Sequence, residues 1–208
     1  MKLLTILFGF ISICCSSQDN DTKLHRDVGS GSEKVLIVYL SRTNNTKAVA
    51  EIIHENVGGD LVALVLVNPY PEDYKTTVAQ VAKENETEFL PPLKTKINDI
   101  EHYDVVFVGF PTWGMQLPPP IKSFLKQYDL SGKTIVPFNT NGGYGIGSSF
   151  STVKELCPNS KVVEGFSIKG GVERDGILLV IEGDKKKEAR LDIKEWLRKI
   201  NMLRQDTK

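Results

Sequence analysis

The sequence predicts an α/β fold in which a parallel sheet of five strands is covered by helices on both faces. Five short apolar segments, rich in β-branched residues, alternate with longer segments that have helical periodicity. Strands that are apolar along their whole length are typical of parallel strands buried on both faces. The alternation therefore indicates a doubly wound sheet in a single domain, which we assign to residues 34–205.

Each expected strand is a short apolar run. The first and third run from Val35 to Leu40 and from Val105 to Phe110, and neither contains a charged or amide side chain. The other three are residues 61–67, 134–138 and 162–166. Because ligands bind outside the carboxyl ends of parallel strands, the segments that follow the strands are the first place to look for a site.

Five helices are expected between and after these strands, over residues 45–57, 72–88, 121–128, 148–156 and 184–203. The first is followed by Gly58 and Gly59, which favour helix termination, and the second by two prolines. In the second helix, Val78, Ala79 and Ala82 are expected to face the protein interior.

The segment after the first strand is rich in hydrogen-bonding side chains. One helix N-cap needs one such residue, whereas five of these six residues carry a hydroxyl or an amide. The unpaired amides and the dipole at a helix N-terminus favour a phosphate dianion. Arg42 either adds positive charge to this site or points to solvent. The expected phosphate-binding residues are Ser41, Arg42, Thr43, Asn44, Asn45 and Thr46.

The segments after the third and fourth strands offer aromatic and glycine-rich surfaces. Trp113 follows the end of a strand, where an indole gives a flat face for stacking on a ring. Tyr144 stands in a loop with four glycines, which let the backbone approach a planar ligand closely. The expected ligand-binding residues are Pro111, Thr112, Trp113 and Gly114 in one loop, and Thr140, Asn141, Gly142, Gly143, Tyr144 and Gly145 in the other.

Residues 39–47 resemble the phosphate-binding loop of flavodoxins, whose pattern is Ser/Thr-x-Thr-Gly-x-Thr. Ser41, Thr43 and Thr46 match the hydroxyl positions of that pattern, and Asn44 replaces its glycine. Asparagine tolerates a positive φ better than most residues, so the turn is expected to persist.

The two later loops correspond, in order, to the second and third flavin-contacting loops of that family. The resemblance implies the strand order 2-1-3-4-5 and FMN as cofactor, with Trp113 covering one face of the isoalloxazine ring. It also implies that the flavin carries the redox chemistry, so no catalytic side chain is assigned. The hypothesis is an FMN-binding electron-transfer protein. The alternatives are an FMN-dependent NAD(P)H:quinone-type oxidoreductase and a binding or scaffold domain without FMN.

The N-terminus predicts export. Lys2 precedes an apolar run over residues 3–13, which is too short to span a bilayer but suits the hydrophobic region of a signal peptide. Cys14 and Cys15 follow directly, and this arrangement resembles a bacterial lipoprotein signal with the lipid on one of the two cysteines. A secretory signal cut beyond the cysteines and an uncleaved anchor are the alternatives.

We therefore expect a signal peptide over residues 1–15 and a flexible tether over residues 16–33, which contains a Gly-Ser-Gly-Ser run. The protein is then anchored to a membrane through its lipid and faces the periplasm or the cell exterior.

Charge and cysteine content exclude several classes of protein. Lys and Arg balance Asp and Glu, 26 against 26, so the chain lacks the basic surface of a nucleic-acid-binding protein. The three histidines are scattered, so no metal site is expected. Cys157 is expected to be a packing residue. The expected partners are a redox protein or a small-molecule electron donor or acceptor, and a monomer is favoured over a dimer.

Overall fold

The computed structural model describes residues 33–203. The expected signal peptide, Cys14, Cys15 and the expected tether up to residue 32 lie outside the described residues.

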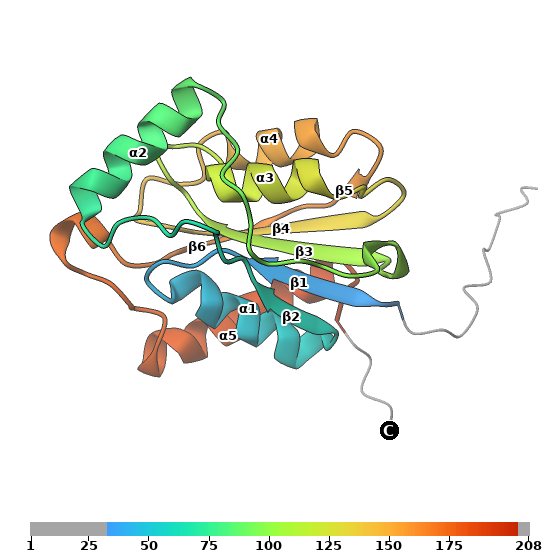
Figure 1. The fold of residues 1–208 in the computed structure, drawn as a ribbon. Helices are drawn as coiled ribbons and strands as arrows, with labels where there is room; N and C mark the ends of the chain where they lie inside the picture. The colour runs from blue at the N-terminus through green and yellow to red at the C-terminus, as the bar shows by residue number, and fades with distance from the viewer. Residues whose placement is uncertain (1–32, 204–208) are drawn as a thin grey trace, which may run out of the picture. The chain divides into compact units, whose positions relative to one another are not determined.

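The sheet is entirely parallel and has the strand order β2-β1-β3-β4-β5, with β6 also paired to β4 (Figure 1). This confirms the expected α/β fold and its order 2-1-3-4-5. The strands are β1 Val35–Tyr39, β2 Asp60–Ala63, β3 Val105–Pro111, β4 Thr134–Asn141, β5 Lys161–Val162 and β6 Phe166–Lys169.

The expected fifth strand over residues 162–166 is wrong in its bounds, because two short strands, β5 and β6, occupy its place in the sheet. The gap lies beside Pro137 of β4. Ile135 accepts a hydrogen bond from the Val163 amide, so alternate residues of β4, including Pro137, face this edge of the sheet. Proline has no amide hydrogen to donate to a neighbouring strand, and the pairing resumes only at Phe138 with Phe166.

The expected second strand, residues 61–67, is also too long. Beyond Ala63 the chain pairs with a different segment, since the Val67 amide donates to Pro92 and the Lys94 amide donates to Val65. The Leu64 amide still donates to Tyr39 of β1, and residues 65–67 then leave the sheet for a local pairing with the segment that follows the second helix.

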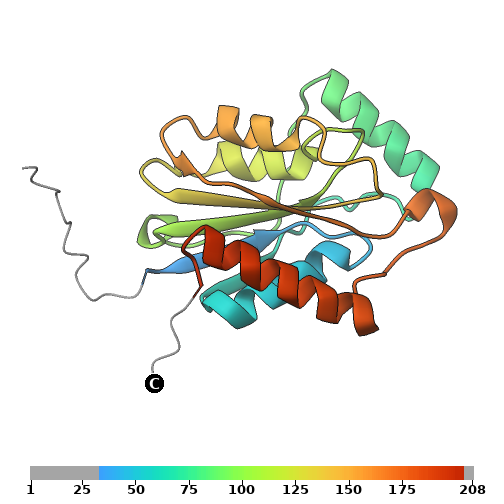
Figure 2. The same cartoon turned by 180° about the vertical axis from the view of Figure 1, so that it is seen from behind.

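Two helices cover each face of the sheet. α1 Asn45–Val57 and α5 Gly183–Lys199 lie on one face, and α3 Pro119–Gln127 and α4 Ser149–Leu156 lie on the other (Figures 1 and 2). α1 has the expected bounds. α5 ends at Lys199, before the expected residue 203. Residues 33–203 also contain two 3-10 turns, Ile100–His102 and Glu173–Asp175.

Alternate strand residues point to opposite faces and build two separate cores. Ile37, Phe107 and Val136 are fully buried against α1 and α5, whereas Leu36 and Val106 are fully buried in the cluster under α3 and α4. This double burial explains why the strands are apolar at every position.

α2 Tyr74–Glu86 stands apart from these layers, at the carboxyl ends of the strands (Figure 1). The expected inward face of this helix is wrong, because Val78 is 47% exposed and Ala79 and Ala82 are also exposed. Its buried residues are Thr77, Val81 and Glu84. Within residues 33–203, no helix combines the length and apolar character needed to cross a membrane.

Candidate functional site

A cavity of about 710 Å³ lies at the carboxyl ends of the strands. This volume is in the range of sites for small molecules and cofactors. Five segments line it: the loop after β1, helix α2, the loop after β3, the loop after β4, and the segment after β6. The cavity therefore lies where a doubly wound sheet is expected to bind its ligand.

The loop after β1 leads into α1 through a left-handed residue. Asn44 has φ 63° and ψ 0°, the conformation that glycine favours, so this asparagine adopts the turn that was expected of it. The amides of Asn45 and Thr46 open the helix and have no carbonyl partner within it. The Lys47 amide is capped by the Ser41 hydroxyl at 3.2 Å. Free amides and a helix dipole at the cavity wall are the features that suit an anion.

Asn45 and Thr46 are both buried, and their side chains hold other segments in place. The Asn45 amide group donates to the Leu178 carbonyl at 2.7 Å, and its oxygen accepts from the amides of Val180 and Ile181. The Thr46 hydroxyl contacts the Thr140 hydroxyl at 2.8 Å. The loop after β1 is thereby joined to the end of β4 and to the segment before α5.

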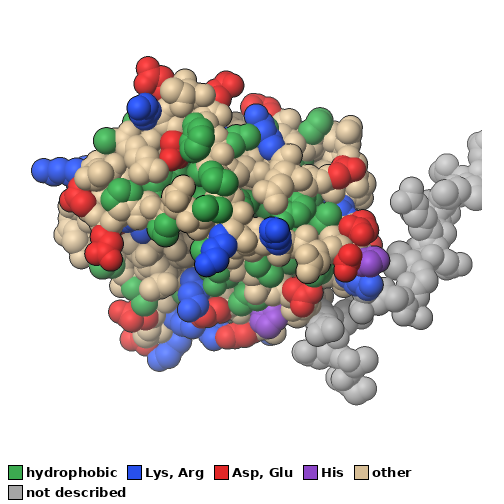
Figure 3. Space-filling model, viewed as in Figure 1, with side chains coloured by type: hydrophobic (Ala, Val, Ile, Leu, Met, Phe, Trp, Pro, Cys, Tyr) green, Lys and Arg blue, Asp and Glu red, His purple; other side chains and the backbone are tan. Residues whose placement is uncertain are grey.

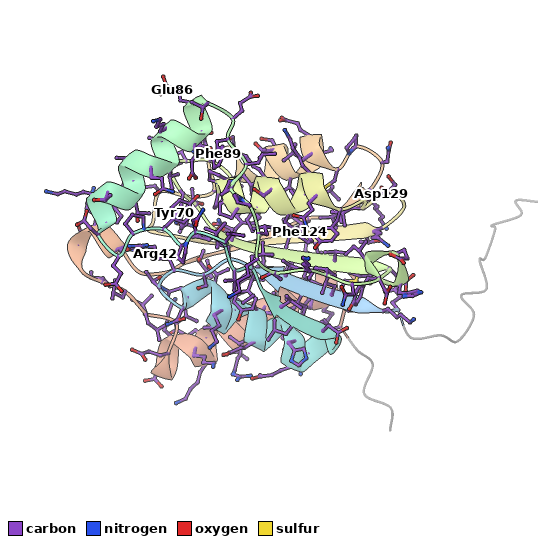
Figure 4. All side chains as sticks on the ribbon, viewed as in Figure 1. Arg42, Tyr70, Glu86, Phe89, Phe124 and Asp129 are labelled. Carbon is purple, nitrogen blue, oxygen red and sulfur yellow. The ribbon has the colours of Figure 1, made fainter. Side chains whose placement is uncertain are left out.

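Arg42 points neither to open solvent nor to a free anion site. Its guanidinium forms an ion pair with Glu173 at 2.5 Å and donates to the carbonyls of Pro71 and Glu72. The Arg42 and Glu173 side chains are 18% and 20% exposed. Figure 4 shows Arg42 and Tyr70 beside each other, below α2.

Trp113 lies at the cavity wall and packs against another aromatic ring. The ring centroids of Trp113 and Tyr70 are 5.2 Å apart at an interplanar angle of 88°. Tyr70 donates to the buried carboxylate of Glu84 on α2, which also accepts from Gln80 at 2.8 Å. Burial and the nearby Glu84 carboxylate raise the pKa of the Tyr70 phenol. The indole is thus held by a chain of contacts that runs from α2 through Tyr70.

The glycine-rich loop after β4 is shaped by amide side chains. The Asn141 side-chain oxygen accepts from the amides of Gly143 at 2.8 Å and Gly145 at 3.2 Å. The fully buried Asn139 donates to Thr112 at 2.9 Å and thereby joins this loop to the loop after β3. Tyr144 stands at the tip and is 69% exposed. The loop therefore offers an aromatic ring at the rim of the cavity.

Gly147 brings the two loops into direct contact. A Cβ atom on this residue would lie 2.0 Å from the Met115 carbonyl oxygen, and its φ is 54°. Both the space and the conformation therefore require glycine.

Thirteen of the sixteen expected binding residues line the cavity. The other three are Ser41, Asn44 and Gly143. Ser41 and Asn44 shape the start of α1 instead, and the Gly143 amide is bonded to Asn141.

Two walls of the cavity were not anticipated from the sequence. One is the face of α2 that carries Tyr74, Val78, Val81 and Ala82. Their spacing is the same as that of an apolar helix face that packs on a core, so the sequence does not indicate that this face lines a cavity. The other is the segment from Gly170 to Arg174, whose sequence has no distinctive signal apart from its glycines.

The carboxylates of Asp99 and Glu101 lie close to the His102 ring, a proximity not anticipated from the sequence. All three residues are exposed on a surface turn away from the cavity. An exposed group of this kind does not by itself make a metal site.

Comparisons with known proteins agree with this geometry. The model of a family described as Flavodoxin matches residues 34–183. A flavodoxin from Nostoc sp. is 25% identical over 123 residues, which cover 57% of this chain and 58% of that protein. The match thus spans less than two thirds of that relative.

Two solved structures extend the comparison. A candidate flavoprotein from Bacteroides eggerthii is 36% identical, with a TM-score of 0.60 over 65% of this chain and 87% of that one. A flavoprotein from Lactobacillus acidophilus, solved in complex with FMN, is 22% identical, with a TM-score of 0.59 over 66% of this chain and 93% of that one. The second likeness concerns the fold.

Proposed function

The chain belongs to the flavodoxin family, and from this premise we propose that it binds FMN and transfers electrons through it. The observation that carries the proposal is the convergence of three loops on one cavity. The anion site at the start of α1 suits the FMN phosphate, and the loops with Trp113 and Tyr144 suit the isoalloxazine ring. The order of these loops along the chain is the one that the family resemblance implies.

The residues present fit this cofactor. Asn44 keeps the left-handed turn although it replaces the glycine of the family pattern, and this argues against a domain that has lost FMN. Glu173 is a carboxylate at the cavity wall, where it could oppose a phosphate, but Arg42 neutralises it. A Cβ at Gly145 would meet no atom within 4 Å, so there is room beside this loop.

FMN, when bound, supplies both one-electron and two-electron chemistry, and the protein supplies binding and orientation. The Trp113 indole limits access of water to one side of the ring site. The exposed Tyr144 at the rim marks the side from which an electron donor or acceptor approaches.

The test is a titration of the purified protein with FMN, followed by flavin fluorescence and visible absorption. We expect fluorescence to be quenched at micromolar concentrations, and a Trp113→Ala variant to bind about tenfold more weakly, because one aromatic contact is lost. Unquenched fluorescence with the wild-type protein would contradict the proposal. Trp196→Phe is the matched control, because Trp196 packs on Phe107 and Phe166 and does not line the cavity.

One observation favours an FMN-dependent NAD(P)H:quinone-type oxidoreductase as the second candidate. The face of α2 opposite the flavin loops is largely apolar, with Tyr74, Val78, Val81 and Ala82 at the cavity wall. Such a wall suits a flat organic acceptor beside the flavin. Anaerobic addition of NADH or NADPH separates the candidates, because rapid bleaching of the flavin is expected of the reductase only.

We also propose export and attachment to a membrane through a lipid on Cys14 or Cys15. The support is the apolar run over residues 3–13 and the two cysteines that follow it. The N-terminus has no twin arginine, so we expect the chain to cross the membrane unfolded and to acquire FMN afterwards. Fatty-acid labelling of the wild-type chain and of Cys14→Ala and Cys15→Ala variants tests the attachment. Labelling that survives the loss of both cysteines contradicts it.

A further inference from the structure

Residues 170–181, which we call the strap, run from the end of β6 to the start of α5 (Figure 1). The strap folds back on itself, because the Ile177 amide donates to the Val172 carbonyl at 3.1 Å. A Cβ on Gly171 would lie 1.8 Å from the Leu178 carbonyl oxygen, so the two arms are in close contact. The arm from Gly170 to Arg174 lines the cavity.

The base of the strap is bound to the loop after β1. Asn45 is 2% exposed, and its side chain makes hydrogen bonds to Leu178, Val180 and Ile181. These bonds use both polar atoms of the side chain. Because a buried amide that loses its partners is destabilising, this end of the strap stays fixed.

The tip of the strap is held by one ion pair in a more exposed position. The Arg42 guanidinium contacts Glu173 of the strap, and its other nitrogens donate to Pro71 at 2.8 Å and Glu72 at 2.5 Å. Pro71 and Glu72 lead directly into α2, whose N-cap is Asp73. Arg42 therefore ties the loop after β1 to both of the peripheral walls of the cavity.

We propose that Arg42 and Glu173 are positioning residues that fasten the strap over the bound flavin, and that their ion pair opens when the flavin enters or leaves. The inference rests on the proposed function, because the strap lines the cavity that is proposed to hold the flavin. Three hydrogen bonds join the guanidinium to the strap and to the segment before α2, and Glu173 balances its charge, so we assign to Arg42 the closing of the cavity. Arg42 does not act through a contact with the phosphate.

The two roles of Arg42 predict opposite results for a Glu173→Gln variant. If the pair fastens the strap, this variant releases both FMN and riboflavin about tenfold faster, because a hydrogen bond between charged groups is weakened. If Arg42 is a phosphate ligand held back by Glu173, the same variant leaves the release of FMN unchanged or slower. Because riboflavin has no phosphate, its release rate reports only whether the strap closes the cavity.

The experiment measures release rates of FMN and riboflavin from the full-length wild type, Glu173→Gln, Arg42→Gln and the double variant by stopped-flow fluorescence. We expect the double variant to release riboflavin no faster than Arg42→Gln, since the ion pair is already lost in that single variant. Asp175→Asn is the matched control. It removes a carboxylate from the same strap, but Asp175 pairs only with its neighbour Arg174 and does not line the cavity.

Hydrogen exchange of the flavin-free proteins checks the fastening independently. We expect faster exchange in residues 172–177 of the Glu173→Gln and Arg42→Gln variants and unchanged exchange in β1 and β3. If Arg42→Gln loses protection from hydrogen exchange throughout the sheet, Arg42→Lys replaces it in both experiments. Lysine keeps the positive charge but cannot reach all three partners. Unchanged release of both flavins from Glu173→Gln would overturn the proposal. Failure of the wild type to bind either flavin would instead overturn the proposed function.

Discussion

The hydroxyl oxygens of Thr46 and Thr140 lie 2.8 Å apart, and this buried contact joins the first turn of α1 to the end of β4. β3 lies between β1 and β4 in the sheet, so the contact crosses over the carboxyl end of β3. The loops that carry the expected phosphate and ring sites are therefore held in one fixed arrangement.

Replacing either threonine by valine tests this arrangement. Thr46→Val leaves the Thr140 hydroxyl buried without a partner, and we expect the free energy of unfolding to fall by about 1–2 kcal/mol. The Thr46→Val/Thr140→Val double variant is expected to lose less than the sum of the two single losses, since it leaves no unpaired hydroxyl. Urea denaturation measures all three. Additive losses would show that the contact has no energetic weight.

The left-handed conformation of Asn44 gives a second prediction. Alanine tolerates this conformation poorly, so Asn44→Ala is expected to lower the free energy of unfolding by about 1 kcal/mol and to weaken FMN binding. Asn44→Gly is expected to bind FMN at least as tightly as the wild type. Asn201→Ala is the control, because Asn201 has φ 58° at the end of α5 and does not line the cavity. It should lose similar stability in a thermal or urea unfolding experiment and keep its FMN affinity.

Gly147 gives a third prediction, because two separate constraints meet there. Gly147→Ala forces a Cβ into the Met115 carbonyl in addition to straining a positive φ, so the loops after β3 and β4 must move apart. In Gly132→Ala the added Cβ meets no atom within 4 Å. Its only cost is the backbone strain at a φ of 76°, about 1 kcal/mol.

Calorimetry and FMN titration of the two glycine variants compare these effects. We expect Gly147→Ala to lose more stability than Gly132→Ala and to bind FMN more weakly. Equal losses in stability with equal FMN affinity would mean that the contact between the two loops is unimportant.

Cys157 leads to a prediction about pH. Burial raises the pKa of its thiol to about 11, so the folded protein keeps a proton that the unfolded chain loses at lower pH. Stability from this group is therefore complete below the unfolded pKa of about 8.5 and is lost as the pH rises toward 11. We expect the free energy of unfolding to fall over this range by less in Cys157→Val than in the wild type. The same slope in both proteins would contradict the shift.

Much of the fold follows from the sequence, because its signals are local. β1, β3 and β4 are continuous apolar runs, and glycines end α1 at the predicted residue. The fifth strand was misjudged because its break depends on Pro137, which lies in the neighbouring strand. A missing amide hydrogen affects the partner strand, and no pattern within residues 162–166 shows it.

The candidate site was predictable to the same degree. The three loops that line the cavity follow directly from the ends of strands, so most of their residues could be named in advance. The direction of Arg42 could not, because its partners are 29 to 131 residues away in sequence. The inward face of α2 was predicted wrongly, because apolar residues have the same spacing on a helix whether they face a core or a cavity.

Hydrophobic side chains also gather on the outer surface near α2, where Phe89, Val65 and Val67 are each about half exposed (Figure 3). These residues lie in or beside the segment that pairs residues 64–67 with residues 92–95, and they do not line the cavity. These apolar side chains therefore lie at the surface of the fold, whereas the apolar side chains of the central strands are fully buried.

The way in which each wall of the cavity is attached to the fold has a consequence for the order in which the parts of the protein open on heating. The loops after β1, β3 and β4 are attached to strands that lie inside the sheet, so we expect them to persist until the whole domain melts. The tip of the strap is held to the loop after β1 by the ion pair of Glu173 with Arg42, and on our proposal it separates on a shorter timescale. On this proposal the protein combines a binding surface that lasts as long as the fold with a cover whose lifetime depends on the contacts of Arg42.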